Sequence, residues 1–374
     1  MKKIGILTIH NSYNYGAVLQ AYATQRTLVE LGFDVELINY STEVSKKTKK
    51  FLVLPKSKQD IKHNLRNIRH PLMFFKRKKK FETFIFKYMT LSKREYNRNN
   101  IRLAENEDYD YLVTGSDQTF NLNLRGNIWD RQAYFLPFEF AGKKISYAAS
   151  MGEYMSLLTA EQKDWIKIAL SDYSRISVRE PVAADFIEDL IGKRPDVIFD
   201  PTLALTREQW DSVCKVQPPK GKIKDKEKYI LFYTVTSEKW VVDFAEKISK
   251  QTGMKIVAAH PQNSLEIGRD FERVSDSGPS EFLSLIKNAS FVITTSFHGT
   301  IFSMIYEKPF YSLVLGEGNR QTSLLSQAGL GGRVILEKSK VPEFSLDNSD
   351  VKQAKHFLEK ANNVNINFLK SELN

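Results

Sequence analysis

"KIGILTIHNSYNYGAVLQAYATQRTLVELGFDVELINY" (residues 3–40) contains two short apolar runs separated by an amphipathic stretch. The run at 3–9 predicts a buried strand, 17–32 predicts a helix that ends at Gly32, and 34–40 predicts a second strand. Two strands joined through a helix form a parallel βαβ unit. This stretch therefore predicts an α/β fold built on a parallel sheet.

The same alternation continues and predicts two Rossmann-like domains, over residues 1–204 and 205–348, with a linker rich in Pro, Gly and Lys at 218–228. We expect residues 349–374 to form a helix that packs back on the first domain. In the first domain, further strands are expected at 109–115, 143–150, 174–180 and 196–200, and helices near 160–171 and 181–190. In the second, strands are expected at 229–235, 254–260, 290–296 and 309–315, and helices near 239–251, 278–289, 299–307 and 320–328.

The composition indicates a protein of a reducing compartment. The chain has 374 residues, enough for two domains, and a single cysteine, Cys214, which cannot form an intrachain disulfide. The apolar run near the start is too short for a secretion signal, and no run approaches the ~20 apolar residues of a membrane span. We expect a cytoplasmic protein.

Most of the positive charge lies in one segment, a predicted helical insertion in the first domain. Residues 41–102 hold 19 Lys/Arg and 4 Asp/Glu in a chain of net charge +11, and "FFKRKKKFETFIFKYM" (74–89) mixes lysines with aromatics. The insertion is either a solvated surface with its aromatics turned to the core, or a patch that makes peripheral contact with an anionic membrane. No nucleic-acid-binding motif accompanies the charge, so we expect no nucleic-acid partner.

Polar residues directly after predicted strands mark candidate sites, because ligands of open α/β sheets bind beyond the carboxyl ends of the strands. In the first domain, the loop at 10–16 leads into a helix whose N-terminus favours an anion, while its Tyr and Asn side chains favour a sugar. Asp117 is either a ligand or a helix cap. Arg179 binds an anion or pairs with an acid such as Glu180. The loop candidates are His10, Asn11, Asn14, Tyr15, Gly16, Ser116, Asp117 and Gln118.

In the second domain, "TTSFHGT" (294–300) places His298 at a turn between a strand and a helix. The field at a helix N-terminus favours neutral histidine, which suits acid or base chemistry, although a structural histidine in a turn is the alternative. Arg320 lies at the next strand-to-helix junction, with Arg333 beyond that helix. Arginines at strand ends of both domains, Arg179 and Arg320, suit a small, multiply charged anion.

Several enzyme classes lack their signatures. The sequence has no Cys/His cluster, Walker A loop or GxSxG motif, so metal hydrolase, nucleoside triphosphatase and serine hydrolase functions lack support. We expect neither a metal nor another cofactor.

Six segments, "YNYGAVLQAYA", "GSDQTFN", "YAASMG", "SVRE", "DPTLAL" and "SFHGTIFS", together resemble the polysaccharide pyruvyl transferase family. The resemblance extends from residue 3 to about residue 333. It implies two Rossmann-like domains with a cleft between them, as in GT-B-like glycosyltransferases. It also implies transfer of the enolpyruvyl group of phosphoenolpyruvate onto two hydroxyls of a sugar, which gives a pyruvate ketal and releases phosphate.

The resemblance further implies roles for the candidate residues. His298 is expected to be the catalytic general acid, and the first-domain loop residues are expected to bind the acceptor. That acceptor is a sugar or lipid-linked oligosaccharide of capsule, exopolysaccharide or cell-wall glycan assembly, reached from the inner face of the membrane. The residues expected to bind phosphoenolpyruvate are Arg179, Arg320, Ser296, Gly299, Thr300 and Arg333.

The chain departs from the family pattern at two positions. Many members have an arginine where this chain has Ser296, and often a tryptophan where it has Phe120. The missing positive charge is then supplied by Arg320 or Arg333, or is absent. Two rival functions remain open: a glycosyltransferase that uses a nucleotide sugar, and a glycan-binding protein without catalysis.

Overall fold

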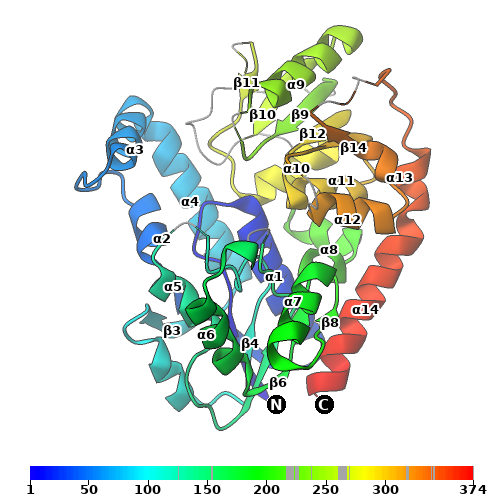
Figure 1. Ribbon diagram of the computed structural model, residues 1–374. Coiled ribbons are helices and arrows are strands. Elements are labelled where there is room, and N and C mark those ends of the chain that lie inside the picture. The colour runs from blue at the N-terminus through cyan, green and yellow to red at the C-terminus, as the bar shows by residue number, and fades with distance from the viewer. Residues whose placement is uncertain are drawn as a thin grey trace. The chain divides into compact units, whose positions relative to one another are not determined.

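A computed structural model (Figure 1) describes residues 1–124, 126–152, 155–215, 223, 227–236, 238–259, 268, 270–316, 320–337, 339 and 342–373. Most of the linker predicted at 218–228 lies outside these residues. The chain divides into two compact units. Unit 1 comprises Met1–Lys50, Ile85–Leu205 and Ala361–Asn374, and unit 2 comprises Phe51–Phe84 and Thr206–Lys360.

Unit 1 is built on a parallel sheet in the order β3-β2-β1-β4-β5-β6. Numbered along the chain this is the order 3-2-1-4-5-6 of a Rossmann fold, with the switch point between β1 and β4. The strands are β1 (Lys3–Leu7), β2 (Asp34–Tyr40), β3 (Leu91–Tyr96), β4 (Tyr111–Thr114), β5 (Lys143–Ser146) and β6 (Tyr173–Arg175); a separate parallel pair is β7 (Ser177–Val178) and β8 (Asp196–Val197). The helices are α1 (Tyr15–Glu30), α2 (Glu43–Thr48), α5 (Ile128–Gln132), α6 (Ala160–Leu170) and α7 (Pro181–Ile191).

Local signals explain where these helices begin and end. The Asn14 side chain caps α1, and Thr159 forms a capping box at the start of α6. Pro181 opens α7, and Gly192, with a φ of 72°, ends it in the left-handed region that glycine tolerates. Each cap satisfies backbone groups that the first or last turn leaves unpaired.

Unit 2 repeats the same topology, with a parallel sheet in the order β11-β10-β9-β12-β13-β14. The prediction of an α/β fold with parallel sheets is therefore confirmed in both units. The strands are β9 (Tyr229–Tyr233), β10 (Lys255–Ala259), β11 (Glu272–Arg273), β12 (Phe291–Thr294), β13 (Phe310–Val314) and β14 (Val334–Leu336). The helices are α8 (Arg207–Val213), α9 (Lys239–Thr252), α10 (Pro279–Asn288), α11 (Phe297–Ile305), α12 (Arg320–Gln327) and α13 (Ser349–Gln353).

The basic insertion differs from the expectation, since it does not belong to unit 1 as a whole. Its residues 51–84, with α3 (Lys58–Arg69) and most of α4 (Pro71–Tyr88), group with unit 2. The Lys80 ammonium lies 3.8 Å from carboxylate oxygens of both Asp276 and Glu281. A Cβ at Gly278 would lie 2.7 Å from the Lys80 Cβ, so α4 and the start of α10 pack closely.

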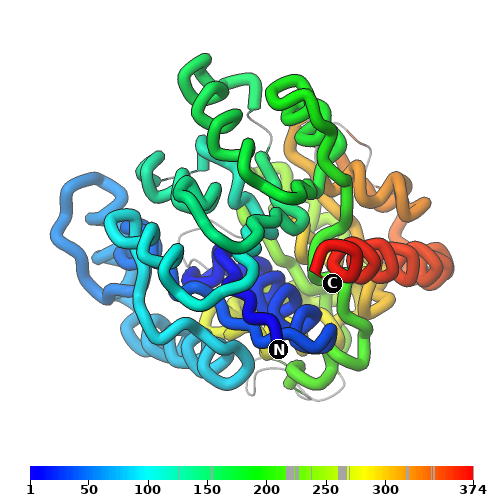
Figure 2. The backbone as a smooth tube through the Cα atoms, turned by 90° about the horizontal axis from the view of Figure 1, so that it is seen from below, coloured from blue at the N-terminus to red at the C-terminus, as the bar shows by residue number. Residues whose placement is uncertain are grey.

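The last helix, α14 (Lys355–Leu373), contributes its residues from Ala361 onward to unit 1. There, the Phe368 ring stacks on Tyr147 at 6.2 Å, and Asn365 donates to the Asp200 carbonyl. Figure 2 shows the two ends of the chain side by side, where Lys2 Nζ donates to the Leu373 carbonyl. Among the described residues, no helix has the length and apolar character needed to cross a membrane.

Candidate functional site

The loop after β1 carries the first group of candidate residues. Asn14 Oδ1 accepts from Ala17 N at 3.3 Å and so caps α1, while Asn11 donates to Ser41 Oγ. Asn14 is exposed and Asn11 is partly exposed, whereas Tyr15 and Gly16 are buried at the start of the helix. Of these, the two asparagines are the side chains that a ligand can reach.

His10, in the same loop, is almost fully buried. Its Nδ1 lies 3.0 Å from the Thr8 carbonyl, which fixes the ring with Nδ1 as the donor. The pKa of His10 is lowered from 6.5 to about 4, chiefly by burial and also by Lys49, while the hydrogen bond to the Thr8 carbonyl acts to raise it. The ring is therefore neutral near pH 7.

The second group follows β4, which pairs with β1. Ser116 is fully buried and donates to the Ala148 carbonyl at 2.9 Å, while Asp117 and Gln118 are partly exposed. Asp117 adopts a φ of 56°, and its carbonyl accepts from Ser150 N at 2.9 Å. Because β1 and β4 are neighbours at the switch point of the sheet, the loops at 8–14 and 115–118 leave the same edge.

Arg179 lies in unit 1 with two acids. Its Nη1 donates to Asp200 Oδ2 at 2.5 Å and its Nε to Glu180 Oε1 at 3.2 Å. Burial acts to lower the pKa of Arg179, but Glu180 and Asp200 outweigh it and hold that pKa above the usual value. The alternative that Arg179 pairs with an acid is thus observed, while donor binding by Arg179 stays a prediction.

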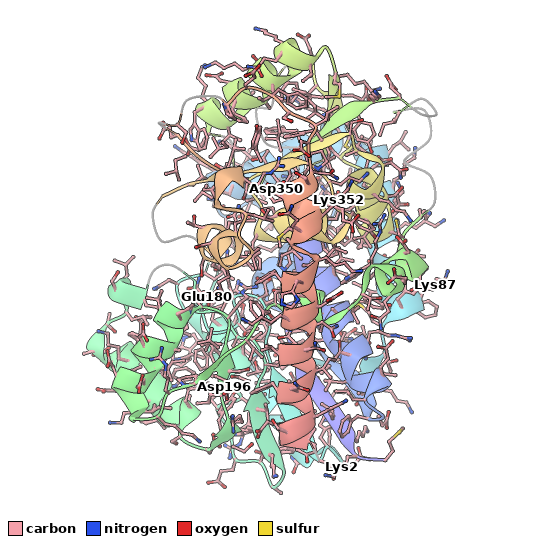
Figure 3. All side chains as sticks on the ribbon, turned by 90° about the vertical axis from the view of Figure 1, so that its right-hand side faces the viewer. Lys2, Lys87, Glu180, Asp196, Asp350 and Lys352 are labelled. Atoms are coloured by element: carbon pink, nitrogen blue, oxygen red, sulfur yellow. The ribbon has the colours of Figure 1, made fainter. Side chains whose placement is uncertain are left out.

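Asp200 is a buried structural residue of unit 1. It caps the 3₁₀ turn Pro201–Ala204 by accepting from Thr202 N at 3.0 Å and Thr202 Oγ1 at 2.7 Å, and Ser116 Oγ lies 3.4 Å from its Oδ2. Glu180, labelled in Figure 3, accepts from Ser150 Oγ at 2.7 Å. Asp200 of the motif "DPTLAL" therefore caps the turn and also forms a buried ion pair with Arg179. These bonds connect the loops that follow β4, β5 and β7.

In unit 2, His298 occupies the first turn of α11, directly after β12. Ser296 is the N-cap, and its Oγ accepts from Gly299 N at 3.3 Å. An arginine side chain at this position could not accept this bond, so the serine supplies the cap of α11. His298 is 7% exposed, so little of its surface is accessible.

Arg320 lies close to the same turn. Its guanidinium carbon is 5.5 Å from the centroid of the Phe297 ring, and that ring lies edge-on to His298 at 5.5 Å. A guanidinium over an aromatic face is held there by a cation–π interaction. Arg320 and His298 thus each lie against the Phe297 ring.

Hydroxyl groups hydrogen-bond the first turn of α11 to the neighbouring strand β13. Thr300 Oγ1 lies 2.9 Å from Ser312 Oγ, which also accepts from Gln321 Nε2 at 3.0 Å. A Cβ at Gly299 would clash with Thr294 Oγ1 and lie 2.8 Å from a Tyr233 ring carbon, so only glycine fits there. Thr300 and Gly299 therefore fix the position of His298 against the sheet.

Arg333 is engaged elsewhere in unit 2. Its Nε donates to Asp350 Oδ2 at 2.8 Å, its Nη2 to Asp350 Oδ1 at 2.5 Å and to the Asp347 carbonyl at 2.7 Å. Asp350 is labelled in Figure 3. This bidentate pair ties the start of α13 to β14, and nothing in its geometry links Arg333 to His298.

Phe120, where relatives often have tryptophan, is a core residue. It is 1% exposed and stacks on Phe135 at 4.4 Å. The exchange of one large aromatic for another therefore changes packing rather than a ligand contact. Within the part of the chain that the structure describes, no group of three or more His, Cys, Asp or Glu side chains is arranged to hold a metal ion.

Solved structures with a similar fold include an epimerase and a rhamnosyltransferase. UDP-GlcNAc 2-epimerase from Methanocaldococcus jannaschii has a TM-score of 0.52 and 14% identity, over 95% of this chain and 92% of that chain. Spinosyn rhamnosyltransferase SpnG has a TM-score of 0.50 and 9% identity, over 100% of each chain. At such identity these likenesses show the fold alone, an α/β fold of the GT-B type.

Comparison with curated protein sequences gives no match. The family model described as polysaccharide pyruvyl transferase matches residues 14–316, which include Asn14, Arg179, Asp200 and His298. This match spans most of the chain, so the chain belongs to the polysaccharide pyruvyl transferase family.

Proposed function

We propose that the chain transfers a pyruvyl group from phosphoenolpyruvate to a sugar as a ketal. In this reaction the C2–O bond to phosphate breaks, and C2 forms bonds to two sugar oxygens. Carbon C3 gains one hydroxyl proton and becomes a methyl group, and the other hydroxyl proton leaves with the phosphate. The enzyme must therefore move a proton and stabilise the charges of a phosphate and a carboxylate.

The observation that carries this proposal is that Arg320 and His298 both lie against the Phe297 ring at the start of α11. Arg320 offers a fixed cation beside a histidine, which is what an anionic donor that accepts a proton requires. It also replaces the arginine that many relatives have at the position of Ser296. We leave Arg333 out of the donor site because Asp350 already binds its guanidinium on two nitrogens.

His298 acts as the general acid in this proposal. It sits at the N-terminal end of α11, where the backbone N–H groups favour an anionic ligand. Gly299 and Thr300 hold the turn, and Ser296 caps it. The donor half of the reaction is thus assigned to unit 2.

The acceptor half is assigned to unit 1. Asn11, Asn14, Asp117 and Gln118 reach the surface at the carboxyl edge of its sheet, and amide and carboxylate groups are suited to sugar hydroxyls. Arg179 holds this edge in shape through Asp200 and Glu180 rather than by carrying a free charge. The acceptor we propose is a sugar or lipid-linked oligosaccharide of capsule, exopolysaccharide or cell-wall glycan assembly, which places the enzyme at the inner membrane face.

Ligand titration of the purified full-length chain tests the donor assignment. We expect phosphoenolpyruvate to bind, and Arg320→Gln to weaken binding by about 10- to 100-fold, since one charge-assisted hydrogen bond is worth about 1.5–3 kcal/mol. Arg273→Gln, which changes an exposed arginine of β11, is the matched control and keeps wild-type affinity. Binding of UDP without binding of phosphoenolpyruvate would instead favour a nucleotide-sugar glycosyltransferase.

A further inference from the structure

Helix α3 in the basic insertion is amphipathic, but its polar side chains face the protein and its apolar side chains face outward. Its inner face is polar and binds the backbone of the preceding loop: Asn64 exchanges two hydrogen bonds with Val53, at 2.9 and 2.8 Å, and Asn67 donates to the Phe51 carbonyl at 2.8 Å. Asp60 is buried and accepts from Lys56 N at 2.9 Å. These polar side chains of α3 therefore bind backbone groups of the protein.

The apolar residues of α3 face outward instead. Ile61, Leu65 and Ile68 are 49%, 50% and 56% exposed, and their spacing of four and three residues puts them on one face of the helix. Leu72, 74% exposed, follows at the start of α4. Figure 1 shows α3 beside the first half of α4. We call Ile61, Leu65, Ile68 and Leu72 the outer face.

Cations outnumber acids along the segment that carries the outer face, although Lys80 of α4 is paired with Asp276 and Glu281. Between residues 51 and 81 the chain has ten Lys/Arg and one acid, Asp60, which points inward. Lys58, Lys62 and Arg69 of α3 are exposed. An exposed apolar stripe flanked by cations needs a partner that is apolar below its surface and negatively charged at it.

The charge selects among the candidate partners. A second copy of this chain would bring two strongly basic faces together, which repels. A nucleic acid would satisfy the lysines but leave the isoleucine and leucine side chains without apolar contacts. An anionic lipid bilayer satisfies both, because its phosphate groups bind the cations while its acyl region takes up the aliphatic side chains.

We propose that the outer face of α3 is a membrane-docking surface that inserts Ile61, Leu65, Ile68 and Leu72 into the interface of an anionic bilayer. This docking does not depend on the transfer reaction proposed above. If that reaction uses a lipid-linked acceptor, docking through α3 holds unit 2 at the surface that carries the acceptor.

Sedimentation of the full-length protein with lipid vesicles tests this proposal. We expect the protein to bind vesicles of mixed phosphatidylcholine and phosphatidylglycerol, and to bind pure phosphatidylcholine much more weakly. The triple variant Ile61→Gln, Leu65→Gln and Ile68→Gln keeps helix-forming residues on a solvated face, so it should fold normally by circular dichroism. Its affinity for the anionic vesicles should fall on the order of 100-fold, because three half-exposed aliphatic side chains no longer insert.

A matched control uses three exposed apolar residues of unit 1. The variant Leu157→Gln, Ile168→Gln and Val182→Gln should bind vesicles as the wild type does. Higher salt should weaken wild-type binding, since the Debye length falls from about 30 Å at 0.01 M to about 8 Å at 0.15 M.

Three results would overturn the proposal. In the first, the wild type remains in the supernatant with anionic vesicles at low salt. In the second, the α3 triple variant binds these vesicles as tightly as the wild type does. In the third, light scattering finds a wild-type dimer that the α3 variant abolishes without change in vesicle binding, which would assign the outer face to a second copy.

Discussion

Loss of the Asp200 carboxylate should destabilise unit 1 more than any surface change in it. Asp200 is 1% exposed, and it receives bonds from Arg179 Nη1 at 2.5 Å and from Thr202 N and Oγ1 at 3.0 and 2.7 Å. In Asp200→Ala the Arg179 guanidinium stays buried with one acid fewer, and the turn at 201–204 loses its cap. Removing one partner of a buried pair costs about 3–5 kcal/mol.

Thermal unfolding followed by circular dichroism measures this effect. For a unit of this size, 1 kcal/mol shifts the midpoint by about 2–4 °C, so we expect a decrease of about 6–20 °C in the transition of unit 1. Arg194→Ala, which breaks an exposed pair with Asp185 and Glu188, is the control and should leave the midpoint almost unchanged. Arg179→Met combined with Asp200→Asn should recover part of the loss, because the buried guanidinium is gone and Glu180 keeps its bond from Ser150 Oγ. An Asp200→Ala midpoint equal to that of the control would refute this reasoning.

Two further predictions concern the turn of α11 and the loop after β1. Gly299→Ala forces a Cβ against Thr294, so it should lower the free energy of unfolding by about 1–3 kcal/mol in urea denaturation. Gly331→Ala, at a site with no neighbour within 4 Å, is the control and should be neutral. Equal effects of the two changes would contradict the packing argument. For His10, the pKa is about 4 in the folded chain against 6.5 in the unfolded chain, so the unfolded chain alone binds a proton between these values. Stability should therefore fall as the pH drops from about 6.5 to about 4, by about 3 kcal/mol more in the wild type than in His10→Asn, and parallel pH profiles of the two would disprove the assignment.

The fold was accessible from the sequence because both units alternate apolar strands with amphipathic helices. The strand β3 was missed, since "LSKREY" is a polar edge strand without a buried run. Thr206 and Gln209 have the spacing of three residues that is typical of a capping box, and both of its bonds are present. Signals that act within one turn of helix are therefore visible in the sequence.

Pairing over longer distances was not accessible in the same way. Arg179 and Asp200 are 21 residues apart, and only the parallel pairing of β7 with β8 brings them together. The same holds for Lys80, whose partners Asp276 and Glu281 lie almost 200 residues away and group residues 51–84 with unit 2. A lysine-rich helix gives no sequence signal for which acids it will meet.

Turnover with phosphoenolpyruvate tests the central claim most directly. The wild type is incubated with phosphoenolpyruvate and a glycan acceptor, and released phosphate is measured together with the proton NMR signal of the new ketal methyl group. We predict equal amounts of both products. In His298→Asn the rate should fall by about 100-fold or more, while the thermal midpoint stays at the wild-type value. Undiminished turnover in His298→Asn, or glycosyl transfer from a nucleotide sugar with no phosphate released from phosphoenolpyruvate, would contradict the account.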